Sequence, residues 1–175
     1  MTINWKEGTY RQYAAAIDTL ENAINTCPDD LWQGCLWHDS EWEQFFLPEF
    51  WYIAYHTLFW IDLYLSGSEE GFAPPPPFTL VELNEEGPLP EKPYTKEELL
   101  SYLDHCRKKC RTTILETGDE AAMRVCSFAW GEVSFYELLL YTMRHVQEHA
   151  AQLSLFLGQQ AGPDTTGWVS GMKST

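Results

Sequence analysis

The stretch SFYELLLYTMRHVQEHAAQL, which covers residues 134–153, decides how this chain folds. Its apolar residues recur every three or four positions, which is the period of a helix with one buried face. Ser134 begins a capping pattern, so we expect a long helix that starts there and continues to Gly158. On such a helix His145 and His149 project from the same face, one turn apart.

A second aromatic stretch, PEFWYIAYHTLFWIDLYLSG, covers residues 48–67. Pro48 suits the first turn of a helix and Gly67 suits its end, so this segment also predicts a helix. His56 falls on the expected buried face, where an imidazole without a partner would cost about 1–3 kcal/mol. The sequence leaves two kinds of partner open, a hydrogen bond to a carbonyl or tyrosine hydroxyl, or a metal ion.

Two further helices are expected from the same reasoning. Apolar residues recur at helical spacing over 10–24, and Pro28 then closes the segment. Thr95 and Glu98 form a capping box, and the apolar face that follows them ends near Gly118.

The segments between these helices indicate how the helices are arranged. Residues 68–94 contain most of the ten prolines, including the run Pro74–Pro77, and predict a stiff, extended crossover. Such a crossover can travel the length of a bundle, so the second and third helices can run parallel. Residues 29–46 predict a packed connection whose tryptophans lie on the bundle, and the tail from Gly162 predicts a loosely held strap anchored by Trp168. The sequence therefore predicts an all-α fold, a four-helix bundle that forms one domain over all 175 residues.

The composition excludes several classes of function. A net charge of −15 would repel a phosphate backbone, so we expect no nucleic acid partner and no anionic membrane surface. No stretch has the length and apolarity of a membrane span and no signal peptide is visible, so we expect a soluble protein in the cytoplasm. Five cysteines is an odd number, which favours reduced thiols in that compartment.

Three histidines carry the candidate chemistry. An isolated pair such as His145 and His149 would more often be packed or exposed than metal-bound. His56, buried on a second helix, changes that balance, because three inward imidazoles favour one divalent ion. The spacing is not the H-E-x-x-H of metalloproteases, since Val146 follows the first histidine, and paired Glu-x-x-His motifs of di-iron bundles are missing from the sequence.

The third predicted helix offers a competing metal site at Cys106, Cys110 and His105. We favour core packing there, because both cysteines fall on the apolar face and His105 points about 100° away from Cys106. We assign no role to the remaining cysteines and histidine, which are Cys27, Cys35, Cys126 and His38.

With these two segments the chain resembles the DinB/YfiT-like superfamily of helical bundles. The resemblance implies an up-down-down-up bundle whose metal ligands come from one helix-two residue, His56, and from an H-x-x-x-H motif, His145 and His149. Gln152 follows the motif at a position where such proteins commonly have Gln. The usual Arg-Gly before that Gln is replaced by Ala150-Ala151.

Three imidazoles leave open positions on an ion, which suits a reactive site more than a structural one. We expect Zn, Ni or Fe, with Zn or Ni favoured. The resemblance implies a transferase that uses a low-molecular-weight thiol and a small-molecule substrate. Tyr141 and Gln152 lie one turn on either side of the histidine pair and Glu148 lies at its edge, which makes them candidates for orienting ligands. Ordinary helix packing or a solvated edge is the more common role for such residues. The alternative is a non-enzymatic, stress-linked bundle that binds a metal or a small ligand. The broad aromatic faces also predict a homodimer.

Overall fold

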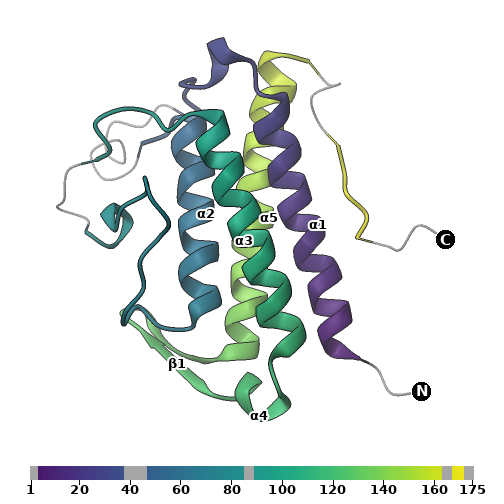
Figure 1. Cartoon of the computed structure of the whole chain (residues 1–175). Helices are drawn as coiled ribbons and strands as arrows, with labels where there is room; N and C mark the ends of the chain where they lie inside the picture. Colours follow the sequence, from purple (N-terminus) through teal and green to yellow (C-terminus); the bar gives the residue numbers. More distant parts are fainter. Residues whose placement is uncertain (1–3, 38–46, 85–88, 163–166, 172–175) are drawn as a thin grey trace.

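Four long helices account for most of the structure, a computed structural model that describes residues 4–37, 47–84, 89–162 and 167–171. Their apolar faces meet in one core that is rich in tyrosine and phenylalanine. The helices are α1 (Trp5–Thr26), α2 (Phe50–Ser66), α3 (Lys96–Glu116) and α5 (Phe135–Gln160). The predicted helical fold is confirmed (Figure 1).

The helices form a square in which α1 and α2 lie on one diagonal, because each of them packs against both α3 and α5. In Figure 1, α1 and α5 run from the bottom of the view to the top, whereas α2 and α3 run from the top to the bottom. Contacts from α2 agree with this direction: Trp51 packs on Tyr94 just before α3, and Asp62 contacts Lys109 further along both helices. The long crossover thus permits the parallel pair that its length predicts.

The helix ends follow local chemistry, and the prediction is wrong at two of them. Gly67 ends α2 in the left-handed conformation at φ 75°, and a Cβ there would clash with the Arg124 guanidinium. Pro48 precedes α2 and does not lie in its first turn, because the helix begins at Phe50. Gly158 does not end α5, which continues to Gln160, since a glycine within a well-packed helix costs only about 1 kcal/mol.

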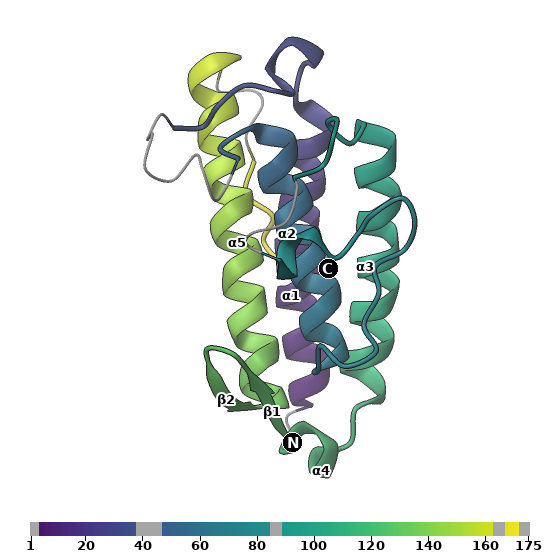
Figure 2. The same ribbon diagram turned by 90° about the vertical axis from the view of Figure 1, so that its left-hand side faces the viewer.

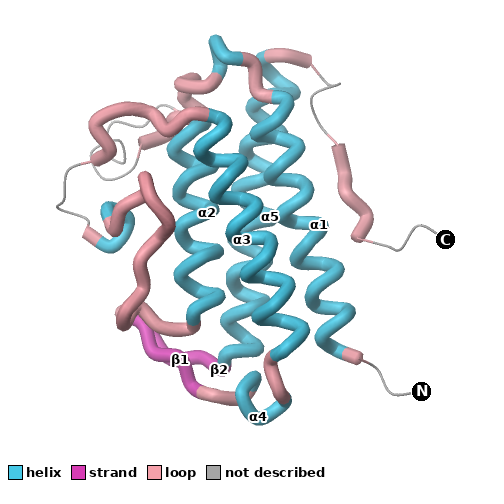
Figure 3. Tube along the Cα trace, viewed as in Figure 1, coloured by secondary structure: helices cyan, strands magenta, loops and turns pink. Residues whose placement is uncertain are grey.

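A small β-hairpin at the base of the bundle was not predicted (Figure 3). It follows a single helical turn, α4 (Asp119–Ala122), and pairs β1 (Val125–Phe128) with β2 (Gly131–Ser134) in antiparallel register. The last residue of β2, Ser134, is also the N-cap of α5, where its side chain accepts a hydrogen bond from the Glu137 N–H. The hairpin therefore sets the point at which α5 begins.

The connections pack on the bundle at specific points. Trp32 donates its indole N–H to the Tyr94 carbonyl oxygen at 2.9 Å and packs on Phe50, as predicted for this connection. The prediction that Trp168 anchors the C-terminal strap is wrong, because this side chain is 79% exposed. The strap instead approaches α1 at Gly171, which has no side chain to hold it away from Ala15. His38 lies outside the described residues.

Candidate metal centre

The three predicted histidines lie together at mid-height in the bundle, where α2 and α5 pack. His145 Nε2 is 3.2 Å from His56 Nε2 and 3.0 Å from His149 Nε2. Each ring offers one nitrogen, and these three atoms all lie within 4.8 Å of one another. Residues far apart in the sequence thus present their ring nitrogens to a single point. We call these three residues the histidine cluster.

Hydrogen bonds at the outer nitrogens orient two of the rings. His56 Nδ1 donates to Glu82 Oε2 at 2.6 Å, and His149 Nδ1 donates to Gln152 Oε1 at 2.7 Å. A neutral imidazole carries one proton, so a proton at Nδ1 leaves a lone pair at Nε2. Both lone pairs therefore face the centre of the cluster.

Burial keeps the rings of His145 and His149 neutral. Burial, together with the neighbouring rings of His56 and His149, lowers the pKa of His145 to about 2. Burial and His56 likewise lower the pKa of His149 to about 4, although the bond to Gln152 acts in the opposite direction. Neutral imidazole is the form that binds metal ions, so protons compete weakly for these nitrogens near pH 7.

The geometry and the donor set both fit a divalent ion. Zn–N bonds of about 2.0–2.1 Å at tetrahedral angles would separate the ligand nitrogens by roughly 3.3 Å. The observed spacings of 3.0 and 3.2 Å need only a small expansion. Without an ion, a proton on His145 Nε2 could satisfy only one of the two facing lone pairs. A cation is the partner that would satisfy the whole cluster.

His145 is oriented differently from the other two rings. Its Nδ1 is buried and has no hydrogen-bond partner in the part of the chain that the structure describes. Packing between α2 and α5, not an outer hydrogen bond, therefore holds this ring in place.

Glu82 is a residue of the site that the sequence analysis missed. It lies in a single 3-10 turn, η2 (Val81–Leu83), which the crossover carries over the middle of α2 (Figure 2). Its carboxylate accepts hydrogen bonds from both His56 Nδ1 and Trp60 Nε1, and its side chain is 5% exposed. The only available signal was its position between the apolar residues Val81 and Leu83, which is too common to identify a site.

The three residues proposed to orient ligands have different positions. Gln152 contacts His149, as described above. Glu148 is exposed, and its charge acts on the histidine cluster only by raising the pKa of His149. Tyr141 is also exposed and stacks on Trp130 with a centroid distance of 5.0 Å and an interplanar angle of 18°. Only Gln152 therefore directly contacts a ring of the cluster.

An aromatic row leads from the histidine cluster to the hairpin. The ring of His56 packs edge-on against Trp60, which contacts Tyr64 one turn further along α2. Tyr64 contacts Tyr141 across the helix pair and accepts a hydrogen bond from the Trp130 indole at 3.0 Å. Trp130 and Tyr141 remain partly exposed at the end of this row.

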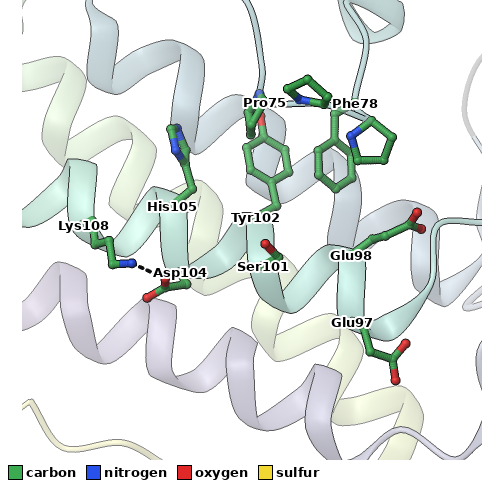
Figure 4. A pocket seen from close by; sticks show the side chains of 11 residues that line it. Pro75, Phe78, Glu97, Glu98, Ser101, Tyr102, Asp104, His105 and Lys108 are labelled. Atoms are coloured by element: carbon green, nitrogen blue, oxygen red, sulfur yellow. Dashed lines mark ion pairs between the residues drawn. The ribbon is translucent and has the colours of Figure 1, made fainter.

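A separate hollow of about 540 Å³ lies over α3 and the proline run (Figure 4). Its polar groups are already engaged: Glu98 caps α3, and Asp104 pairs with Lys108. His105 contacts Asp62 at 3.2 Å. Each of these polar side chains therefore already has a partner and needs no ligand.

The competing thiol site on α3 does not form. Cys106 and Cys110 are fully buried in the core, as the sequence analysis favoured, and His105 turns to Asp62 instead. Within the described residues, the histidine cluster is the one group of three or more His, Cys, Asp or Glu side chains close enough to share an ion.

Comparison with known families agrees with the helical fold. The DinB superfamily model matches residues 12–153, which include α2, α3 and most of α5, and no curated protein gave a significant match. The fold and the site thus define the class of protein, a helical bundle with three histidines near one another. The chain belongs to the DinB superfamily. None of the described helices has the length and apolarity required to cross a membrane.

Proposed function

We propose that this protein is a metal-dependent enzyme in which His56, His145 and His149 hold one divalent ion through their Nε2 atoms, with Zn or Ni favoured over Fe. The observation that carries the proposal is the convergence of three imidazoles, two of which direct a lone pair inward. Three ligands leave at least one position of a tetrahedral or larger coordination sphere for an exogenous group.

The reaction that this site supports best is transfer of a low-molecular-weight thiol to a small electrophile. A bound dication would stabilise the thiolate form of such a thiol near pH 7, which is the chemistry that the metal supplies. The sulfur then forms a bond to the electrophilic carbon as the bond to the leaving group breaks, and the thiol proton goes to solvent.

The protein's own buried thiols do not suit the role of nucleophile. Burial raises the pKa of Cys110 to about 12 and also raises the pKa of Cys106, so both remain protonated within the core. Burial likewise raises the pKa of Cys27 to about 12. These three thiols are therefore poor nucleophiles, which favours a nucleophile from outside the chain and agrees with an open position on the ion.

The aromatic row supports an apolar body on the electrophile. Tyr141 and Trp130 offer partly exposed rings at one end of the row, and Trp60 packs beside His56 at the other. Rings arranged in this way bind flat, apolar groups by stacking and by excluding water. A substrate lying along the row would bring its reactive end to the histidine cluster.

The second candidate function is a non-enzymatic bundle that binds a metal or a small ligand. The partial exposure of the cluster is compatible with both candidates, because an edge of His56 that reaches the surface serves a ligand as well as a substrate. An assay of thiol transfer distinguishes the two candidates, because only the enzyme would catalyse it.

Elemental analysis of untagged protein tests the metal, and we expect about one Zn or Ni ion per chain. Thioether formation from a small thiol and a chromogenic aryl halide tests the reaction. We expect it to require the metal, to be lost in His149→Ala and to persist in His105→Gln, a histidine outside the cluster. Undiminished activity in a folded His149→Ala protein would overturn the catalytic proposal, whereas a metal-bound but inactive wild type would favour the binding function.

A further inference from the structure

The crossover contributes one buried charge to the region of the histidine cluster. Glu82 Oε2 lies 2.6 Å from His56 Nδ1 and 3.0 Å from Trp60 Nε1. Both donors belong to α2 and lie one turn apart, whereas Glu82 belongs to η2 in the crossover. A carboxylate with a side chain only 5% exposed is uncommon unless its surroundings satisfy it.

Two nitrogen atoms of α2 lie within hydrogen-bond distance of one oxygen of the Glu82 carboxylate, and the Trp60 indole N–H can only donate. An ionised carboxylate fits this arrangement, since it accepts from both. An ionised carboxylate can only accept hydrogen bonds. His56 must therefore donate from Nδ1, and its proton cannot be at Nε2 while the ring is neutral.

We propose that Glu82 is a positioning residue of the metal centre, which fixes the His56 ring with its Nε2 lone pair directed at the ion and so makes the crossover part of the site. This inference rests on the proposed function. Glu82 is not a ligand in this arrangement, because its Oε2 is bonded to the nitrogen on the far side of the ring from Nε2.

Glu82 differs from the outer partner of the second ring. Gln152, which accepts from His149, is a neutral amide. A carboxylate that accepts from a ligand imidazole makes the ring a stronger electron donor, and loss of such a partner typically weakens metal binding 10- to 100-fold. It also offsets one of the two positive charges that a divalent ion would bring. Glu82 should therefore matter more to metal affinity than Gln152.

Contacts on the N-terminal side of η2 hold the crossover independently of Glu82. Tyr55 donates its hydroxyl hydrogen to the Thr79 carbonyl oxygen at 3.2 Å, and Phe78 stacks on the Tyr55 and Tyr102 rings. Substitution of Glu82 should leave these contacts in place. The effect of the carboxylate on the metal can thus be measured in a folded protein.

The test compares Glu82→Leu and Glu82→Gln with Glu97→Gln, which removes an exposed carboxylate from α3. Zn²⁺ affinity is measured by competition with a chromophoric chelator. We expect a 10- to 100-fold loss in Glu82→Leu, a smaller loss in Glu82→Gln, which keeps an acceptor, and no change in Glu97→Gln. Nitrogen NMR of the metal-free protein should show His56 protonated at Nδ1 in wild type and Glu82→Gln, but not in Glu82→Leu.

Wild-type Zn²⁺ affinity in a folded Glu82→Leu protein would overturn the inference. A wild-type protein that binds no Zn²⁺ or Ni²⁺ would instead remove the proposed function. In that case the NMR measurement still decides the role of Glu82 toward His56. A ring protonated at Nε2 in wild type would refute it.

Discussion

Helix α2 contributes a residue to each of two buried polar clusters, and the polar groups of the two clusters are satisfied in different ways. Toward α5 it presents His56, whose Nε2 faces two other imidazoles. Toward α3 it presents Asp62, which is 1% exposed and accepts hydrogen bonds from Tyr102, His105 and Lys109. We call the latter group the Asp62 cluster. The two clusters lie less than two turns apart on one helix.

The two clusters differ in how their polar groups are satisfied. In the Asp62 cluster the carboxylate has a cationic partner in Lys109 at 2.6 Å, so charge and hydrogen bonds balance without any added group. In the histidine cluster three imidazole nitrogens face one another instead, at 3.2 and 3.0 Å from the central ring. Substitutions in the first should therefore change stability, and substitutions in the second should change metal binding.

The largest effect is expected for His145→Ala. This ring lies between the other two, so its loss removes one of three ligands, and we expect Zn²⁺ affinity to fall by at least about 100-fold. The stability of the metal-free protein should change little, because the substitution also removes a buried Nδ1 without a partner in the described structure. Chelator competition and urea unfolding measure the two quantities. Strong Zn²⁺ binding by the variant would show that His145 is not a ligand.

Asp62→Leu should show the reverse pattern. Tyr102 loses its acceptor and Lys109 loses its carboxylate partner, at a cost of about 2–3 kcal/mol in the free energy of unfolding. The loss is limited because the partly exposed ammonium keeps its bonds to the Asp62 carbonyl oxygen and to Ser66 Oγ. Zn²⁺ affinity should stay within about twofold of wild type. Urea unfolding of the metal-free protein measures the first, and a large loss of metal affinity would show that the clusters are coupled.

How far the sequence alone leads differs between the two clusters. The histidine cluster was predictable because His145 and His149 share a helix face by spacing, and because His56 falls on a face whose aromatic neighbours must be buried. Asp62 was not identified, since its partners lie on α3 and become neighbours only through the parallel packing of the two helices. Periodicity shows which face of a helix is buried but not which side chains meet there.

Other features could not be predicted from the sequence for related reasons. The strands of the hairpin, such as Val125–Phe128, are too short to show an alternating pattern. Glu82 depends on the path of a proline-rich segment, for which the sequence contains no repeating signal. Trp168 was expected to be buried from its residue type alone, yet the strap leaves it in solvent.

Acid should destabilise the metal-free protein through the histidine cluster. In the unfolded chain the histidines titrate near 6.5, whereas the folded pKa is about 4 for His149 and about 2 for His145. Below pH 6.5 the unfolded state therefore binds more protons than the folded state, and stability falls as the pH drops from 6.5 toward 4, by about 2–3 kcal/mol for each of the two rings. Urea unfolding across this range measures the slope. The double variant His145→Gln/His149→Gln should show a shallower slope, and an equal slope would assign the effect to other groups.

The smallest effect is expected for His105→Gln, at the edge of the Asp62 cluster. The His105 side chain is 45% exposed, and Asp62 keeps its bonds to Lys109 and Tyr102 when the imidazole is lost. The free energy of unfolding should change by no more than about 0.5–1 kcal/mol, and Zn²⁺ affinity should not change. A histidine that is hydrogen-bonded to a buried carboxylate can resemble a catalytic pair, so this variant tests whether the His105–Asp62 pair takes part in the proposed activity. Loss of thioether-forming activity without loss of stability would move the reactive site to α3.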